Sequence, residues 1–559
     1  MRFKTRQRKP KGSRRPLRLV GAGLSAALAG GASWQVVRLD RPGIAILILA
    51  ASLAVPAGLL ARCWWQRTPF DIPARLPRHL STSARVRWLE RPFLGWSRTW
   101  YGWERWAMGT FEDSVGVIGP PRVSKTLSAG VPQVLLWGGP LVSIAPKPDV
   151  FRASAGRRRQ LTDRHGGQLL VYAPTEDGLV EGLQPCHFSP ADSKDPTTIK
   201  LRIASWQEAA KTSLGVENAN HWQTGGARIL RGLFLACAHH RVRPGDFALV
   251  RSWLARRQLE EPIQILRGLH SYAGDQWAAE LDGVRRMEGS KERDGFFSAA
   301  EVTVDATSAP NVLRSTDRTD FDPERFLLTR STLYVVSPTE HQRSIAPLLA
   351  MLVQDLVHTA YRLHREGRLP ARLLLALDDL ANCCPLPQLE SICSQGGGQG
   401  VNVCWSLQSL AQLRDPAAYG EEQAEAIWSA TRCKLVFGGL SDERSLARLA
   451  ELIQLERVHQ RQHGQDGKVI HSESWRPLLT AAQLREVPDR WALLLYLNQP
   501  PRMLRQPLAL NCRQFRALMK PLAEPKGQVK KTGMPARGWR RALTPLFALL
   551  LALLAGERF

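Results

Sequence analysis

Acidic side chains are scarce in this sequence of 559 residues. It has 50 Asp and Glu against 76 Lys and Arg, so the formal net charge at pH 7 is +26. Such a deficit of acid is extreme for a soluble enzyme that acts alone. It favours polyanionic partners, either nucleic acid or an anionic membrane surface.

Cysteine is also scarce, and its spacing argues against two classes of protein. The nine cysteines include no C-x-x-C pair and no disulfide framework, which speaks against a structural zinc site and against a cross-linked secreted domain. Reduced thiols fit a cytoplasmic compartment. Five of the nine fall in a region that we interpret below as a buried nucleotide-binding core: Cys383, Cys384, Cys393, Cys404 and Cys433.

Internal repeats and long low-complexity segments are absent from the sequence, and its length predicts two or three domains. Much of the positive charge lies at the two ends. We interpret residues 1–18 as a basic cytoplasmic arm and residues 513–559 as a basic tail. The short apolar run 543–556 in that tail is a candidate interfacial helix. A solvated, disordered arm explains each charge run equally well.

Two apolar runs, residues 19–37 and 43–61, follow the basic arm. Each is close to the roughly 20 residues that cross a bilayer as a helix. Lys and Arg outside the short "RLDRP" link predict a two-helix transmembrane anchor over residues 19–67, with both ends in the cytoplasm. The expected location is the inner (plasma) membrane, in contact with lipid. A signal peptide from residue 13 and a buried soluble helical hairpin are the alternatives.

The centre of the chain alternates short apolar runs with helical patterns, which predicts an α/β domain with a parallel-rich sheet. An Arg- and Trp-rich stretch, residues 70–106, is interpreted as a connector from the membrane. The first part of a P-loop NTPase domain is predicted over residues 68–221. An all-helical insertion follows over residues 222–319, and the second part of the domain over residues 320–512.

The stretch "GVIGPPRVSKT", residues 116–126, almost matches the phosphate-loop motif G-x-x-x-x-G-K-[ST]. In such loops backbone N–H groups and a helix N-terminus surround the phosphates, the lysine reaches the β- and γ-phosphates, and the Ser/Thr hydroxyl binds Mg²⁺. Serine replaces the last glycine of the motif. The candidate nucleotide-binding residues are Gly119, Pro120, Pro121, Arg122, Val123, Ser124, Lys125 and Thr126.

Two further strand ends carry polar side chains. Asp378 and Asp379 follow the run "LLLAL"; Asp378 would hold Mg²⁺ through water, and Asp379 would position or deprotonate the attacking water. Gln408 ends the next strand, where it would sense the γ-phosphate. Taken singly, each feature has a purely structural interpretation: the two acids could be a polar strand end or a helix cap, and the glutamine could be an ordinary residue at the start of a helix. Together with the loop they predict Lys125, Asp379 and Gln408 as catalytic residues, Thr126 and Asp378 as metal-binding residues, and ATP and Mg²⁺ as cofactors.

The block "LALDDLANCCPLPQLESICSQGGGQGVNVCWSLQSLAQLRD", residues 375–415, resembles the core of type IV secretion coupling proteins. These are the TraG/TraD-type ATPases of conjugative DNA transfer, and the likeness is strongest to their actinobacterial form. Residues 424–453 and 474–501 continue the resemblance. The anchor, the loop and the helical insertion also follow in the family's order, up to about residue 502.

The resemblance implies an integral membrane protein whose RecA-like cytoplasmic domain forms a hexameric ring. Such a ring would move single-stranded DNA, often with a covalently attached relaxase, into a secretion channel. The helical insertion would correspond to the family's all-α domain, which meets DNA or the processing machinery. Positive charge fits backbone tracking of DNA without base readout.

Three departures from the family pattern bear on catalysis. Ser124 replaces glycine, Asp379 replaces the usual glutamate and is one methylene shorter, and the loop "QGGGQG" offers no arginine finger. Arg414 and Arg444 are the candidates for that finger. These changes favour a slow ATPase, or a pseudo-ATPase receptor that recruits DNA or relaxase without efficient hydrolysis. A membrane DNA pump for chromosome or plasmid segregation is the third hypothesis.

Overall fold

The computed structural model describes residues 90–98, 104–176, 178–214, 220–287, 289–338, 340–453, 455–463 and 469–522. The predicted basic arm, the predicted anchor and the tail beyond residue 522 lie outside these ranges, so the anchor stays a prediction. Within the described ranges, no helix combines the length and the apolar character that crossing a bilayer requires.

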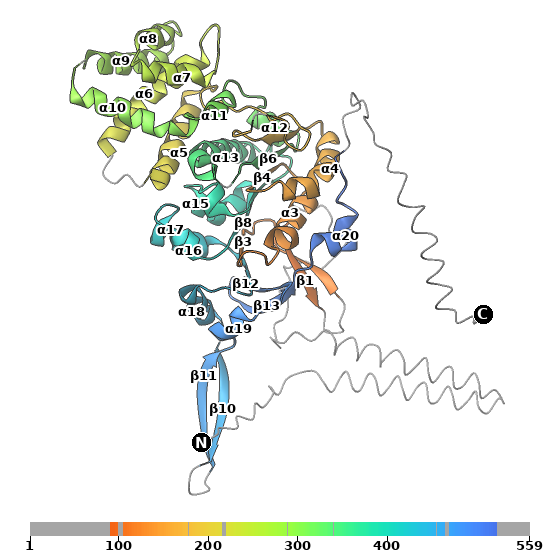
Figure 1. The fold of residues 1–559 in the computed structure, drawn as a ribbon. Helices are drawn as coiled ribbons and strands as arrows, with labels where there is room; N and C mark the ends of the chain where they lie inside the picture. Colours follow the sequence, from red (N-terminus) through yellow and green to blue (C-terminus); the bar gives the residue numbers. More distant parts are fainter. Residues whose placement is uncertain are drawn as a thin grey trace, which may run out of the picture. The chain divides into compact units, whose positions relative to one another are not determined.

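An eleven-stranded mixed sheet organises the fold, in the order β2-β1-β13-β12-β9-β3-β8-β7-β4-β6-β5 (Figure 1). Its strands are β1 (Phe93–Arg98), β2 (Glu104–Met108), β3 (Val115–Ile118), β4 (Leu141–Ala145), β5 (Leu169–Tyr172), β6 (Thr332–Val336), β7 (Leu373–Leu377), β8 (Val401–Leu407), β9 (Cys433–Phe437), β12 (Trp491–Tyr496) and β13 (Gln499–Arg505). Every pairing from β9 to β5 is parallel. The predicted parallel-rich α/β sheet is therefore confirmed.

The central strands are continuous apolar runs because helices cover both faces of the sheet. All residues of β3, β7 and β8 are buried. Successive side chains of a strand point to opposite faces, so Leu373, Leu375 and Leu377 of β7 join one hydrophobic cluster while Leu374 and Ala376 join the other. Helix α13 (Gln342–Arg365) packs into the first cluster, and α3 (Val131–Leu136) and α4 (Asp149–Asp163) pack into the second. The result is a layer of sheet between two layers of helix.

The other edge of the sheet is antiparallel: β12 pairs with β9 and β13, and β1 pairs with β13 and β2. The sequence predicts a connector through residue 106, whereas the structure places β1 and β2 there. Of their aromatic residues, Phe93 and Trp106 are buried and Trp96 is partly buried. Trp106 is buried and packs edge-on against Phe93 and Trp96.

Helices of varied length connect the strands or follow the last of them. They are η1 (Thr126–Gly130, a π-helical turn), α3 (Val131–Leu136), α4 (Asp149–Asp163), α13 (Gln342–Arg365), α14 (Leu380–Cys383), α15 (Leu389–Gln395), η3 (Gly396–Gln399), α16 (Ala411–Arg414), α17 (Gly420–Ala430), α18 (Glu443–Leu452), α19 (Ala481–Arg485), η4 (Ala509–Asn511) and α20 (Arg513–Arg516).

Only helices lie between β5 and β6 among the named elements. They are α5 (Pro196–Leu214), α6 (Asn220–Ala238), α7 (Phe247–Ala255), α8 (Glu260–Arg267), α9 (Tyr272–Arg286), α10 (Lys291–Thr303), η2 (Asp305–Thr307), α11 (Pro310–Arg314) and α12 (Pro323–Leu328). This helical run is longer at both ends than the insertion predicted over residues 222–319. Its core merges with one face of the sheet in a single hydrophobic cluster.

A buried charge network ties the start of the helical run to the α/β part. The Arg202 guanidinium of α5 contacts Asp355 of α13 at 2.8 Å and also pairs with Asp192. A separate two-stranded sheet, β10 (Leu455–His463) with β11 (Val469–Pro477), follows α18. The sequence does not predict this hairpin.

Candidate nucleotide site

Three neighbouring parallel strands end at the same edge of the sheet and carry the predicted site residues. The register aligns Ile118 of β3 with Leu407 of β8, and Leu377 of β7 with Trp405 of β8. Gly119, Asp378 and Gln408 therefore emerge side by side. In the sheet, β4 lies on one side of β3 and β9 lies on the other. The connection after β3 and the connection after β8 therefore run in opposite directions across the sheet. Such a switch point at the carboxyl ends of parallel strands is where α/β sheets bind ligands.

The loop after β3 is tightly packed where it begins. A Cβ at Gly119 would lie 2.7 Å from the Phe437 Cβ, so a larger residue does not fit. Pro121 and Arg122 are exposed at its outer turn, while Val123 packs against the core. Both Arg122 (φ 69°) and Ser124 (φ 63°) adopt left-handed backbone conformations, which glycine tolerates best.

Lys125 folds back over its own loop. Its Nζ donates to the Pro120 carbonyl oxygen at 3.1 Å and to the Gly119 carbonyl oxygen. Burial lowers the pKa of Lys125, while the nearby charges of Asp378 and Asp379 raise it in part. The ammonium group therefore lies between the loop and the two acids that follow β7.

Thr126 and Asp378 are joined directly, although 252 positions separate them. The Thr126 hydroxyl donates to Asp378 Oδ2 at 2.7 Å. Ser406, the penultimate residue of β8, donates to Asp378 Oδ1 at 2.5 Å and accepts from the Asp379 backbone N–H at 3.2 Å. One hydroxyl thus fixes both acids. A carboxylate beside a hydroxyl is a set of hard oxygen ligands of the kind that Mg²⁺ prefers.

Asp379 has a strained backbone and one unsatisfied oxygen. Its φ is 54° in the left-handed region. Oδ2 accepts from Asn382 Nδ2 at 3.0 Å and lies 3.5 Å from Gln408 Nε2. Oδ1 is buried and has no hydrogen-bond partner among the described residues. An acceptor held in this way is placed to receive a hydrogen bond from water or a ligand.

The structure brings together the predicted residues of the loop and of both strand ends. Ser406 and Asn382 belong to the same group, and sequence reasoning missed them. The signal for Ser406 was available, because a polar residue of β8 two positions before Gln408 must face the same side of the sheet as Gln408. Asn382 gave no such signal, since its place depends on the one-turn helix α14.

The two predicted arginine-finger candidates lie near each other on α16 and α18. Arg444 pairs with Glu421 at 2.6 Å. Arg414 is largely buried and makes longer contacts, at 3.8 Å to Glu421 and 3.9 Å to Asp442. A finger acts on the site of a neighbouring copy, so contacts within one chain do not test the role of either residue.

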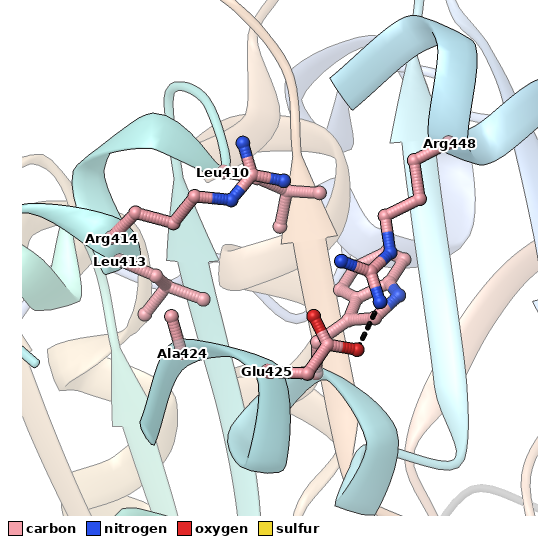
Figure 2. A pocket seen from close by; sticks show the side chains of 7 residues that line it. Leu410, Leu413, Arg414, Ala424, Glu425 and Arg448 are labelled. Carbon is pink, nitrogen blue, oxygen red and sulfur yellow. Dashed lines mark hydrogen bonds and ion pairs between the residues drawn. The ribbon is translucent and has the colours of Figure 1, made fainter. Parts of the chain in front are cut away.

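A small pocket lies beside Arg414. It is lined by Leu410, Leu413, Arg414, Ala424, Glu425, Trp428 and Arg448. Figure 2 shows the Arg414 and Arg448 guanidinium groups on either side of it, with Arg448 paired to Glu425. None of the predicted phosphate-loop residues lines this pocket. It is therefore a feature separate from the nucleotide site, although it follows Gln408 in the chain.

Known proteins with similar sequences are conjugal transfer proteins. The chain is 22% identical over 340 residues to the conjugal transfer protein TraG of Agrobacterium fabrum, which covers 60% of this chain and 50% of that protein. It is 21% identical over 337 residues to the protein of the same name from Rhizobium radiobacter, covering 60% and 51%. The chain thus spans about half the length of these relatives.

A solved structure supports the fold. The unbound form of the bacterial conjugative coupling protein TrwBdeltaN70 is similar with a TM-score of 0.51 and 17% identity, covering 72% of this chain and 86% of that one. At that identity the likeness shows the fold alone, which is the RecA-like α/β fold. The family model for type IV secretory system conjugative DNA transfer matches residues 79–532. The sequence resemblance to coupling proteins is confirmed, and the chain belongs to this family.

Proposed function

We propose that this protein binds ATP with Mg²⁺ at the ends of β3, β7 and β8 and hydrolyses it slowly to move DNA toward a type IV secretion channel. One observation carries the proposal. A lysine, a hydroxyl–carboxylate pair and a carboxylate beside a glutamine converge from three separate parts of the chain at one edge of the sheet.

The residues present fit this ligand and this metal. Thr126 and Asp378 offer oxygen ligands, and the left-handed backbone at Arg122 and Ser124 is a conformation that occurs in anion-binding backbone turns. The partly buried Lys125 supplies a positive charge. Bound Mg²⁺ would neutralise charge on the phosphate oxygens.

Each residue then has a defined task. Lys125 would exchange its contact with the Pro120 carbonyl oxygen for a phosphate oxygen. Asp378 would orient metal-bound water, and Ser406 would keep that carboxylate in place. Asp379 would accept a proton or a hydrogen bond from the attacking water at Oδ1, because its Oδ2 is already engaged by Asn382.

The broader role is also a proposal. Membership of the family supports conjugation over chromosome segregation. We propose a multi-pass inner-membrane protein, anchored through residues 19–67, that assembles as a homo-hexamer. It would receive single-stranded DNA with its relaxase and deliver both to the channel proteins. Genes for a relaxase and for secretion-channel proteins next to this one would support the proposal, whereas segregation genes would oppose it.

Nucleotide binding and turnover by the purified full chain test the site. Lys125→Ala should abolish ATP binding because it removes the charge that faces the phosphates. Lys434→Ala is the matched control, since Lys434 is another mostly buried lysine whose pKa burial lowers, but it lies in β9 beside Trp428. It should keep the wild-type affinity. A folded Lys125→Ala protein that binds ATP as tightly as Lys434→Ala does would refute the assignment of Lys125.

Turnover distinguishes the two functional hypotheses. A slow ATPase should release phosphate, faster with single-stranded DNA, and Asp379→Asn should stop that release while ATP still binds. If the protein binds ATP without releasing phosphate, and Asp379→Asn leaves that behaviour unchanged, the result would favour the receptor that recruits DNA or relaxase without hydrolysis. Three departures from the family pattern motivate that second hypothesis: Ser124 in place of glycine, Asp379 in place of glutamate, and the absence of arginine from the loop "QGGGQG".

A further inference from the structure

Two glutamine side chains from different elements hold strand β1. Oε1 of Gln133, in α3, accepts from the Phe93 backbone N–H at 2.9 Å, and Nε2 of the same side chain donates to the Phe93 carbonyl oxygen. Gln506, just after β13, donates to the Leu94 carbonyl oxygen at 2.6 Å. Both glutamines are fully buried. Adjacent residues of β1 are thus fixed by two side-chain amides.

Gln133 belongs to the helical stretch that begins in the phosphate loop. Thr126 opens η1, and α3 follows at Val131 without a break. Gln133 therefore lies seven positions, or about two helical turns, beyond the predicted Mg²⁺ ligand. A short helix moves as a rigid element, so a shift of the loop end is carried to this amide. Gln506 has no such connection to the loop.

Strand β1 also joins the first and the last described segments of the chain. The Phe93 ring packs edge-on against Phe515 of α20 with ring centroids 5.3 Å apart. Phe515 in turn stacks on Trp106 of β2 at 5.5 Å. The predicted anchor precedes β1, and the basic tail begins with α20. A change in β1 therefore acts on the segments from which both ends of the chain continue.

We propose that Gln133 is a positioning residue that couples the phosphate loop to β1, so that bound nucleotide alters the strand at which the first and the last described segments of the chain meet. The coupling would act through the two hydrogen bonds between the Gln133 side chain and the Phe93 backbone, both of which are buried. If α3 moved without β1, buried polar atoms of Gln133 and of the Phe93 backbone would lose their partners, which is unfavourable. This inference rests on the proposed nucleotide site.

Hydrogen exchange of the full-length protein, with and without a non-hydrolysable ATP analogue and Mg²⁺, tests the coupling. Peptides covering residues 119–126 report binding at the loop, and peptides covering residues 91–98 report β1. In the wild type the analogue should slow exchange at both, at β1 by roughly fivefold or more, which is the lower end of typical coupling between sites. The wild-type measurement needs no variant and so does not depend on a variant's folding.

Two isosteric variants separate coupling from stability. Gln133→Met should keep the response of the loop and lose the response of β1. Gln506→Met removes a buried hydrogen bond from the same strand, so it should loosen β1 to a similar degree and yet keep its response to nucleotide. A purely structural role of Gln133 would make the two variants behave alike, and that result overturns the proposal.

The remaining outcomes are also decisive. A wild-type β1 that does not respond while the loop does would overturn the coupling alone and leave the nucleotide site intact. A β1 response that persists in Gln133→Met would show that another route carries it, and this also overturns the proposal. A loop that never responds to nucleotide refutes the proposed function, and the coupling with it.

Discussion

Substitution of Ser124 by glycine separates two reasons why phosphate loops have glycine before the lysine. One reason is backbone conformation: Ser124 has φ 63°, which costs an L-residue about 1–2 kcal/mol. The other is space, because a Cβ at this position lies close to where phosphate oxygens would bind. The carbonyl oxygen of Ser124 accepts from both the N–H (2.9 Å) and the hydroxyl (2.7 Å) of Ser128, so the turn is well fixed.

The two reasons predict different observables. Relief of the backbone cost, less the roughly 0.5–1 kcal/mol of extra chain entropy that glycine gives the unfolded state, should stabilise Ser124→Gly by about 0.5–1 kcal/mol. In a chain of this size that raises the melting temperature by only about 1–2 °C. Backbone strain present both with and without nucleotide cancels from the affinity. Any gain in ATP affinity therefore measures the steric effect of the Cβ on the phosphates, and we expect a gain of about two- to fivefold.

Ser124→Ala is the matched control, because it keeps the Cβ and the strained backbone and removes only the hydroxyl. Calorimetric ATP titration and thermal unfolding of all three proteins give the answer. We expect Ser124→Ala to bind like the wild type and Ser124→Gly to bind more tightly. Weaker binding by both variants would mean that the hydroxyl contacts a phosphate, and the steric reasoning for this position would be refuted.

Three further predictions follow from charge and burial. Because burial lowers the pKa of Lys125 below its usual 10.5, the ATP affinity of the wild type should fall as the pH rises toward that value, whereas the affinity of Lys125→Arg should not change with pH. An equally steep fall in both proteins would exclude titration of the lysine as the cause. Residues 523–559 contain seven Lys and Arg against two Glu, so truncation after Leu522, where the first compact unit ends, should flatten the salt dependence of DNA binding; an unchanged slope would place the DNA contacts elsewhere. A cysteine placed in the link at residues 38–42 should react with a membrane-impermeant thiol reagent in intact cells, and one beside Gly12 should not; the reverse labelling would contradict the anchor.

The sheet could be predicted from sequence where burial is two-sided. Runs such as Leu373–Leu377 and Val401–Leu407 are almost wholly apolar, and this pattern marks central parallel strands. Their polar ends then point to one edge, which is how Asp378 and Gln408 were found. Order along the chain was enough, because parallel strands of one sheet place their carboxyl ends together.

Other strands gave no such signal, for physical reasons. Strand β1 is held partly by the side chains of Gln133 and Gln506, and its pairing partner β13 lies about 400 residues away. No local pattern encodes a strand of that kind. The β10–β11 hairpin reads as a polar loop, since the stretch "HQRQHGQDGK" lacks the apolar alternation that a sheet packed on a core imposes.

The geometry of the site also bears on whether it works or is a relic. A disused site has no reason to keep unfavourable features, and this one keeps three. Lys125 is charged in a partly buried place, Asp379 has a left-handed backbone, and Asp379 Oδ1 is buried without a partner among the described residues. Strain and unsatisfied groups of this kind cluster where a ligand or a reaction uses them. Replacing Asp379 with asparagine or glycine should therefore stabilise the fold while removing activity. Variants that lose stability together with turnover would show instead that the aspartate serves only the fold.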